Sequence, residues 1–184
     1  SIRIRMELAE IIKYDNLTEV IKKLDNWKVL SLLNENIDLN NKFIRGLNWI
    51  QKLKGNTLLY LIKDSKSLEI VSDRFFINHR EKKVLKDFLE VKKFLENNEK
   101  EILDLSPSGW TEFIEGKNLD KETVKLIISE GGKFWRPFLK WLIIYRNIKS
   151  SKNGKDLKKE GWKPGKKIGD ELKRLRYLEI DNYK

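Results

Sequence analysis

Apolar residues recur at helical spacing over the stretch from about residue 80 to residue 96. They stand three, four or seven positions apart, and Lys and Glu fill most of the positions between them. The members of this stripe are Val84, Leu85, Phe88, Leu89, Val91 and Leu95. Such spacing places the apolar side chains on one face of an α-helix. The pattern predicts an amphipathic helix over 80–96, with His79 at its start.

Shorter stretches with the same spacing predict helices through the rest of the chain. The expected ranges are 3–13, 17–24, 27–33, 43–50, 58–62, 68–71, 107–116, 121–128, 134–148 and 164–179. Asn16 and Asp120 are typical N-cap residues, and Pro107 suits a first helical position. Gly131-Gly132 is interpreted as a helix end followed by a turn, although a ligand loop has the same composition.

Composition supports an all-helical fold. The 184 residues include only 3 Pro and 10 Gly, and 40% of them are hydrophobic. Few helix breakers favour helices over a β fold with many turns, and the apolar share is enough to form a core. The fold class predicted is all-α, a curved stack of short helices rather than one compact bundle. No apolar run reaches the length of a membrane span, so no membrane partner is expected.

Several kinds of catalytic site are not encoded. The chain has no Cys and one His, His79, so neither a thiolate metal site nor a multi-histidine site is expected. It contains no phosphate-binding loop of the G-x-x-x-x-G-K-[ST] type and no Asp-x-Asp pair that would hold two metal ions. We therefore expect no catalysis by this chain alone.

Positive charge is concentrated at the C-terminal end. The formal net charge is +11, and 16 of the 39 Lys and Arg but only 6 of the 28 Asp and Glu lie from Lys133 to Lys184. This end therefore carries +10 of the excess. Such a concentration indicates a surface for a polyanion, most often a nucleic acid. A disordered lysine-rich tail is the alternative, but apolar residues keep helical spacing through the same stretch.

The segment from Asn153 to Leu175 carries the candidate binding residues. Gly154 and Gly161 bracket a short expected helix, and Pro164-Gly165 starts the last helix with Lys166 and Lys167 in its first turn. Helix N-termini attract anions, and two lysines there suit a bound phosphate. The candidate RNA-binding residues are Lys155, Trp162, Lys163, Gly165, Lys166, Lys167, Lys173 and Arg174.

Two features of this segment have a second interpretation. Gly165 and Gly169 lack side chains, so either a sugar-phosphate backbone or a neighbouring helix is able to approach closely. In the second case the segment is a pair of tightly packed helices with a rim of solvated lysines. Trp162 stands in the basic loop, where it either stacks on a base or packs that loop onto the helix.

The same segment resembles the tail of bacterial-type (class II) tRNA nucleotidyltransferases and poly(A) polymerases, the CCA-adding enzyme family. That tail reads T-G-x-D-L, then G-x-x-P-G-P, then G-x-x-L-x-x-L. The matching residues here are Gly154, Asp156, Leu157, Gly161, Pro164, Gly165, Gly169, Leu172, Leu175 and, near the end, Asp181. Asn153, Lys166 and Asn182 depart from the family pattern.

The beginning of the chain also resembles the family. Arg3 and Glu7-Leu8 match the R-I-x-x-E-L stretch that ends the family's neck, which makes Arg3 the candidate neck-motif residue. The resemblance implies the end of the neck and the first body helices over 1–55, a helical body over 56–150 and a basic tail over 151–184. The catalytic head, with its G-S-x-x-R-D and D-x-D motifs, and the E-D-x-x-R motif of the neck would lie before Ser1.

The family resemblance also implies a function. Body and tail would clamp the acceptor–T arm of tRNA in the cytoplasm, with the tail on the elbow, so that the 3′ end reaches a separate head. No cofactor is expected in this chain, whereas the parent enzyme would use Mg²⁺ and ATP or CTP. Two alternatives stay open: a stand-alone helical nucleic-acid-binding module, and a basic scaffold for an acidic protein partner.

Overall fold

The computed structural model describes residues 2–12, 16–34, 37–65 and 68–183. All regular structure in these ranges is helical, and no strand occurs in them. The α-helices are α1 Ile2–Ile11, α2 Leu17–Asn26, α3 Leu30–Leu33, α4 Asn41–Lys52, α5 Thr57–Ile62, α6 Leu68–Arg74, α7 His79–Asn97, α8 Glu99–Leu103, α9 Pro107–Gly116, α10 Lys121–Glu130, α11 Trp135–Ile143, α12 Gly154–Lys159 and α13 Lys166–Asp181, and a 3₁₀ helix, η1, spans Tyr145–Asn147. The all-α stack of short helices predicted from the sequence is confirmed.

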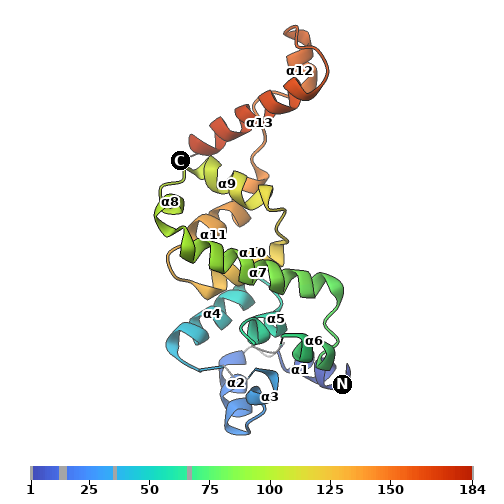
Figure 1. Ribbon diagram of the computed structural model, residues 1–184, viewed down its shortest axis with the longest axis vertical. Helices are drawn as coiled ribbons and strands as arrows, with labels where there is room; N and C mark the ends of the chain where they lie inside the picture. The colour runs from blue at the N-terminus through green and yellow to red at the C-terminus, as the bar shows by residue number, and fades with distance from the viewer. Residues whose placement is uncertain (1, 13–15, 35–36, 66–67, 184) are drawn as a thin grey trace.

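The helices form an elongated stack (Figure 1). α1, α2 and α3 lie at one end, and α12 with the first turns of α13 projects from the other. Between them α10 is the central helix, since α4, α7 and α11 all pack against it. The C-terminal part of α13 packs on α9. No described helix is both long and apolar enough to cross a membrane.

Side-chain caps define the starts of six helices before the tail. The caps at the starts of α2, α4, α5, α7, α9 and α10 are Asn16, Asn40, Asn56, Asn78, Ser106 and Asp120. Each accepts a hydrogen bond from a backbone N–H that has no partner within its helix. Asn16 and Asp120 act as the sequence predicted. Asn56 begins α5 by accepting from the N–H of Leu59 at 3.2 Å.

The core runs continuously through the stack. Phe75, Phe88 and Phe138 are the largest side chains that are fully buried. Trp110 contacts Phe138 edge-on, with ring centroids 5.7 Å apart, and so joins α9 to α11. A single continuous core explains why these short helices, each marginal alone, form one stable unit.

Four local expectations were wrong. Trp27, assigned to a third helix, is 71% exposed and ends α2 instead, because Lys28 adopts a φ of 57°. Leu89, assigned to the buried stripe, is 39% exposed. The helix expected to reach Ile148 ends at Ile143, where the chain tightens into η1. The last helix starts at Lys166 rather than Pro164.

Candidate nucleic-acid interface

The tail is a helical hairpin whose own core is small. Leu157 of α12 and Ile168 of α13 are buried where the two helices meet. The backbone N–H of Trp162 donates to the carbonyl of Leu157 at 3.0 Å and closes the connecting turn. Both helices were expected from the sequence. The outer part of the hairpin extends beyond the body (Figure 1). All residues from Lys158 to Lys167 are exposed.

Arg176 fixes α13 to the body. Its guanidinium donates two hydrogen bonds to the carboxylate of Glu115 on α9, each 2.7 Å long, and a third to the carbonyl of Ile148 at 2.8 Å. Glu115 also accepts from the indole N–H of Trp141 at 3.1 Å. The hydrogen bond from Arg176, against the opposing effect of partial burial, lowers the pKa of Glu115 below its ordinary value. The carboxylate therefore stays ionised and ties α13, α9 and α11 together.

A second contact holds the end of α13. The carboxylate of Asp181 accepts from the backbone N–H of Ser108 at 2.8 Å and from its hydroxyl at 2.7 Å. Ser108 lies in the first turn of α9, where free N–H groups and the helix dipole favour a negative charge. Neither this contact nor that of Arg176 was predicted, because each joins segments more than 60 residues apart.

The candidate cations of the tail fall into two groups. Lys155, Lys163, Lys166 and Lys167 are exposed, and none has a carboxylate partner among the described residues. Lys173 instead donates to Glu112 of α9 at 2.7 Å, and this hydrogen bond raises its pKa. Arg174 donates twice to Glu171 on its own helix, at 2.8 Å each. The first group is free to meet a phosphate, whereas the second already has anionic partners.

The start of α13 is open. Its N-cap Gly165 has a φ of 141°, no side chain caps the helix, and its first turn contains no acidic residue. A Cβ added at Gly165 or at Gly169 would have no atom within 4 Å. The interpretation of these glycines as a tight helix–helix contact is therefore wrong. Free N–H groups, two lysines and an unobstructed backbone together suit an approaching phosphate.

Trp162 lies at the tip of the same hairpin. It is 37% exposed and lines a shallow hollow together with Gly161, Lys163 and Lys167. A second hollow lies between the starts of α12 and α13, with Lys155, Lys158 and Gly165 among its lining residues. The structure thus brings six of the eight predicted residues to the outer hairpin, and places Lys173 and Arg174 nearer the body.

The predicted neck residue Arg3 is at the opposite end. Its side chain is 87% exposed and lies 3.9 Å from Glu7, one turn along α1. The neighbouring Arg5, which the sequence did not single out, donates to Glu81 of α7 at 2.6 Å and to the carbonyl of Phe76 at 2.6 Å. Arg5 therefore docks α1 onto the stack, while Arg3 remains accessible.

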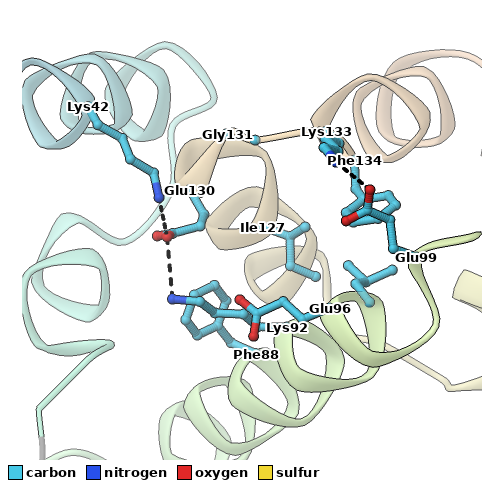
Figure 2. Close-up of a pocket in the computed structure, with 12 residues that line it drawn as sticks. Lys42, Phe88, Lys92, Glu96, Glu99, Ile127, Glu130, Gly131, Lys133 and Phe134 are labelled. Atoms are coloured by element: carbon cyan, nitrogen blue, oxygen red, sulfur yellow. Dashed lines mark hydrogen bonds and ion pairs between the residues drawn. The ribbon is translucent and has the colours of Figure 1, made fainter. Parts of the chain in front are cut away.

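An ionic cluster surrounds Glu130 at the end of α10 (Figure 2). Its carboxylate accepts from Lys42 at 2.9 Å and Lys92 at 3.3 Å, and lies 2.7 Å from the ammonium of the buried Lys63. Burial alone would raise the pKa of Glu130, but the charge of Lys63 and the hydrogen bonds of the lysines hold it at about 2. Asp64 lies 3.3 Å from Lys92 and completes the cluster. The described residues contain no group of three or more His, Cys, Asp and Glu able to hold a metal ion.

Solved structures share this fold. The Thermotoga maritima CCA-adding enzyme in complex with tRNA superposes with a TM-score of 0.68 at 18% identity, and the match covers 100% of this chain and 48% of that one. An apo form of a CCA-adding enzyme superposes with a TM-score of 0.66 at 18% identity, and the match covers 98% of this chain and 46% of that one. A complex of a CCA-adding enzyme with CTP superposes with a TM-score of 0.64 at 17% identity, and the match covers 100% of this chain and 47% of that one. No family model and no curated protein matches the sequence. The chain spans about half the length of these enzymes, and its fold is the fold of that half.

Proposed function

We propose that this chain is the tRNA-binding C-terminal region of a class II tRNA nucleotidyltransferase or poly(A) polymerase. The observation that carries the proposal is the outer hairpin of the tail. There, unpaired lysines surround the uncapped start of α13, on a fold shared with CCA-adding enzymes. One of these enzymes is described in complex with tRNA, which supports tRNA as the partner.

In this proposal the stack and the tail clamp the acceptor–T arm from two sides. The hairpin contacts the elbow through phosphates, using Lys155, Lys163, Lys166 and Lys167. Its lysines and open backbone offer charge but few groups able to read base edges, so recognition rests on backbone position and duplex shape. The attachment through Arg176 sets the distance from the hairpin to the body.

The chemistry of 3′-end addition belongs to a separate head in this proposal. That head would bind Mg²⁺ and ATP or CTP, and this chain would supply only the position of the RNA. Such a division would let this chain serve a nucleotidyl transfer although its described residues contain no cluster of acidic side chains able to hold a metal ion.

The direct test is Lys166→Ala with Lys167→Ala. Loss of two phosphate contacts should weaken tRNA binding and make the slope of log affinity against log salt shallower by roughly 1.4 to 1.8, at about 0.7 to 0.9 per contact. Both side chains are exposed and without a carboxylate partner among the described residues, so thermal stability should stay unchanged or rise slightly.

The matched control is Lys22→Ala with Lys23→Ala. These adjacent lysines of α2 are also exposed, have no carboxylate partner in the described ranges, and lie at the far end of the stack. Lys82 and Lys83 are less suitable because they pair with Asp73 and Asp87. Equal loss of affinity in both double variants would mean that net charge alone attracts the RNA, and a tail variant that melts early would mean that its lysines are structural.

A second comparison separates the alternatives. A fixed hairpin on a rigid stack suits a duplex elbow, so tRNA should bind more tightly than a flexible single strand of equal length. Equal affinity for both would favour a stand-alone polyanion-binding module. Failure to bind either RNA, together with binding of an acidic protein, would favour the scaffold.

A further inference from the structure

A second exposed surface combines aromatic rings with cations, away from the tail. Trp49 of α4 and Trp135 of α11 meet across the end of α10, with ring centroids 5.6 Å apart and planes tilted by 43°. Both indoles are only half-buried. We call the surface formed by Arg45, Trp49, Lys52, Trp135 and Arg136 the α4–α11 face.

The cations of this face have no anionic partner. Arg45, Lys52 and Arg136 are exposed, and no carboxylate of the described chain pairs with them. The guanidinium of Arg136 lies 5.5 Å from the ring centroid of Trp135, and the ammonium of Lys52 lies 6.0 Å from that of Trp49. The rings therefore hold the charges close to the surface on which a planar ligand would stack.

The turn between α10 and α11 adds hydrogen-bond donors. Gly131 and Gly132 have φ values of 74° and 79°, a backbone conformation that glycine adopts readily. The N–H groups of Gly132, Lys133 and Phe134 have no acceptor in the described structure. Successive N–H groups in such a turn form a concavity that binds anions.

This turn borders a pocket of about 400 Å³. Its lining includes Arg45, Trp49, Ser129, Gly132 and Trp135. Ser129 is 3% exposed, and its hydroxyl has no hydrogen-bond partner. An unused buried hydroxyl beside unused N–H groups and a free guanidinium is the pattern expected where a polar ligand supplies the missing partners.

Glu130 and Lys42 also line this pocket, but their charges compensate each other. Glu130 is ionised and is surrounded by Lys42, Lys63 and Lys92, as Figure 2 shows for the first and last of these. Its negative charge is therefore already neutralised. The charge left to attract a ligand is that of Arg45, Lys52 and Arg136.

We propose that the α4–α11 face binds a single-stranded RNA segment, with bases on the indoles and phosphates on Arg45, Arg136 and the Gly131–Phe134 turn. A base is able to stack on an exposed ring only when it is not paired within a duplex, so the aromatic rings select single strands over duplexes. The tail offers mostly lysines and suits a duplex backbone instead. This inference rests on the proposed function, because that proposal supplies the class of ligand, RNA. It adds a second RNA-binding site to the one in the tail.

The test uses the 184-residue chain and a fluorescently labelled hexauridylate, which has no secondary structure. Its affinity is measured by anisotropy at low salt, together with quenching of tryptophan fluorescence. Arg45→Ala with Arg136→Ala should weaken hexamer binding by roughly tenfold, the size expected for two lost phosphate contacts. Trp49→Phe keeps an aromatic ring in the core contact but reduces the stacking area, so it should weaken binding less and diminish the quenching.

The charge-matched control is Lys22→Ala with Lys23→Ala, two exposed lysines of α2 that belong to neither proposed site, and it should keep its full affinity for the hexamer. Equal weakening by both double variants would overturn the site, as would tighter binding of a six-base-pair RNA duplex than of the hexamer. If tRNA does not bind but the hexamer does so through Arg45 and Arg136, the proposed function fails and this site stands. If tRNA binds through the tail and the hexamer does not bind, only this site fails.

Discussion

Arg176 and Glu115 face each other through two parallel hydrogen bonds, each 2.7 Å long. They lie 61 positions apart in the chain and join the tail helix α13 to α9. A bidentate guanidinium–carboxylate pair fixes orientation as well as distance. This pair, together with the contact between Asp181 and Ser108, fixes the direction in which the tail leaves the body.

Arg176→Ala should loosen the tail. It removes the pair and leaves Glu115 with the indole of Trp141 as its remaining partner, at a cost of about 1–2 kcal/mol after allowance for partial solvent exposure. We expect a lower melting temperature and faster proteolytic cleavage after α11. Arg174→Ala is the control, because Arg174 is exposed and bonds only within its own helix. Equal protease resistance of the two variants would contradict the assigned role of Arg176.

Gly169→Ala should separate stability from RNA binding. Gly169 is exposed in the second turn of α13, and an added Cβ would meet nothing within 4 Å. Alanine should stabilise the helix by about 0.5–1 kcal/mol, because glycine loses more backbone entropy on folding. If the RNA backbone approaches this point closely, tRNA affinity should fall in the same variant. A variant that is more stable and binds tRNA unchanged would exclude close approach there.

Glu130→Gln should remove a pH-dependent part of the stability. The folded carboxylate has a pKa of about 2 against an ordinary value of 4.5. Because the lowered pKa favours the ionised form, its contribution is full above about pH 4.5 and is lost as the pH falls toward 2. We expect the variant to be less stable near neutral pH by about 2 kcal/mol, and the difference to shrink in that window.

Chemical denaturation at several pH values measures this difference. The control is Glu90→Gln, since Glu90 is an exposed residue of α7 whose nearest cationic partner is Lys86 at 3.8 Å. Its effect should be small at every pH. A Glu130→Gln difference that stays constant down to pH 2 would show that the lysines around Glu130 do not depend on its charge.

The chain by itself should incorporate no nucleotide. Incubation with tRNA, labelled ATP or CTP and Mg²⁺ should leave the RNA unlabelled, because the described residues contain no cluster of acidic side chains able to hold a metal ion. Incorporation by pure material would assign catalysis to this chain. If the proposed function holds, addition of a separately produced head should produce labelling, and Lys166→Ala with Lys167→Ala should reduce it.

Periodicity and caps predicted the helices because both depend on residues close in sequence. The stripe of Val84 to Leu95 and the cap Asp120 needed no tertiary information. The prediction that placed Trp27 in a third helix failed, because its exposure depends on the turn at Lys28 that ends α2. Helix propensity predicts a helix boundary poorly wherever a single residue at the helix end determines that boundary.

The charged surface was predictable only in part. A run of lysines marks the tail in the sequence, but pairing of Lys173 with Glu112 depends on α9, 61 positions away. The α4–α11 face gave no sequence signal, because its cations and rings come from segments separated by more than 80 positions. Long-range contacts of this kind are set by packing, which residue spacing does not encode.

Because α13 is attached to the body near its C-terminal end, a rotation about that attachment displaces the outer hairpin. Lys166 lies ten residues before Arg176, which corresponds to about 15 Å along a helix with a rise of 1.5 Å per residue. A rotation of about 10° at Arg176 would therefore move Lys166 by about 3 Å, less than one turn of helix. A small adjustment at this attachment thus changes the distance between the tip of the tail and the body by a few ångströms. Such a movement changes the reach of the hairpin without rearranging the core of the stack.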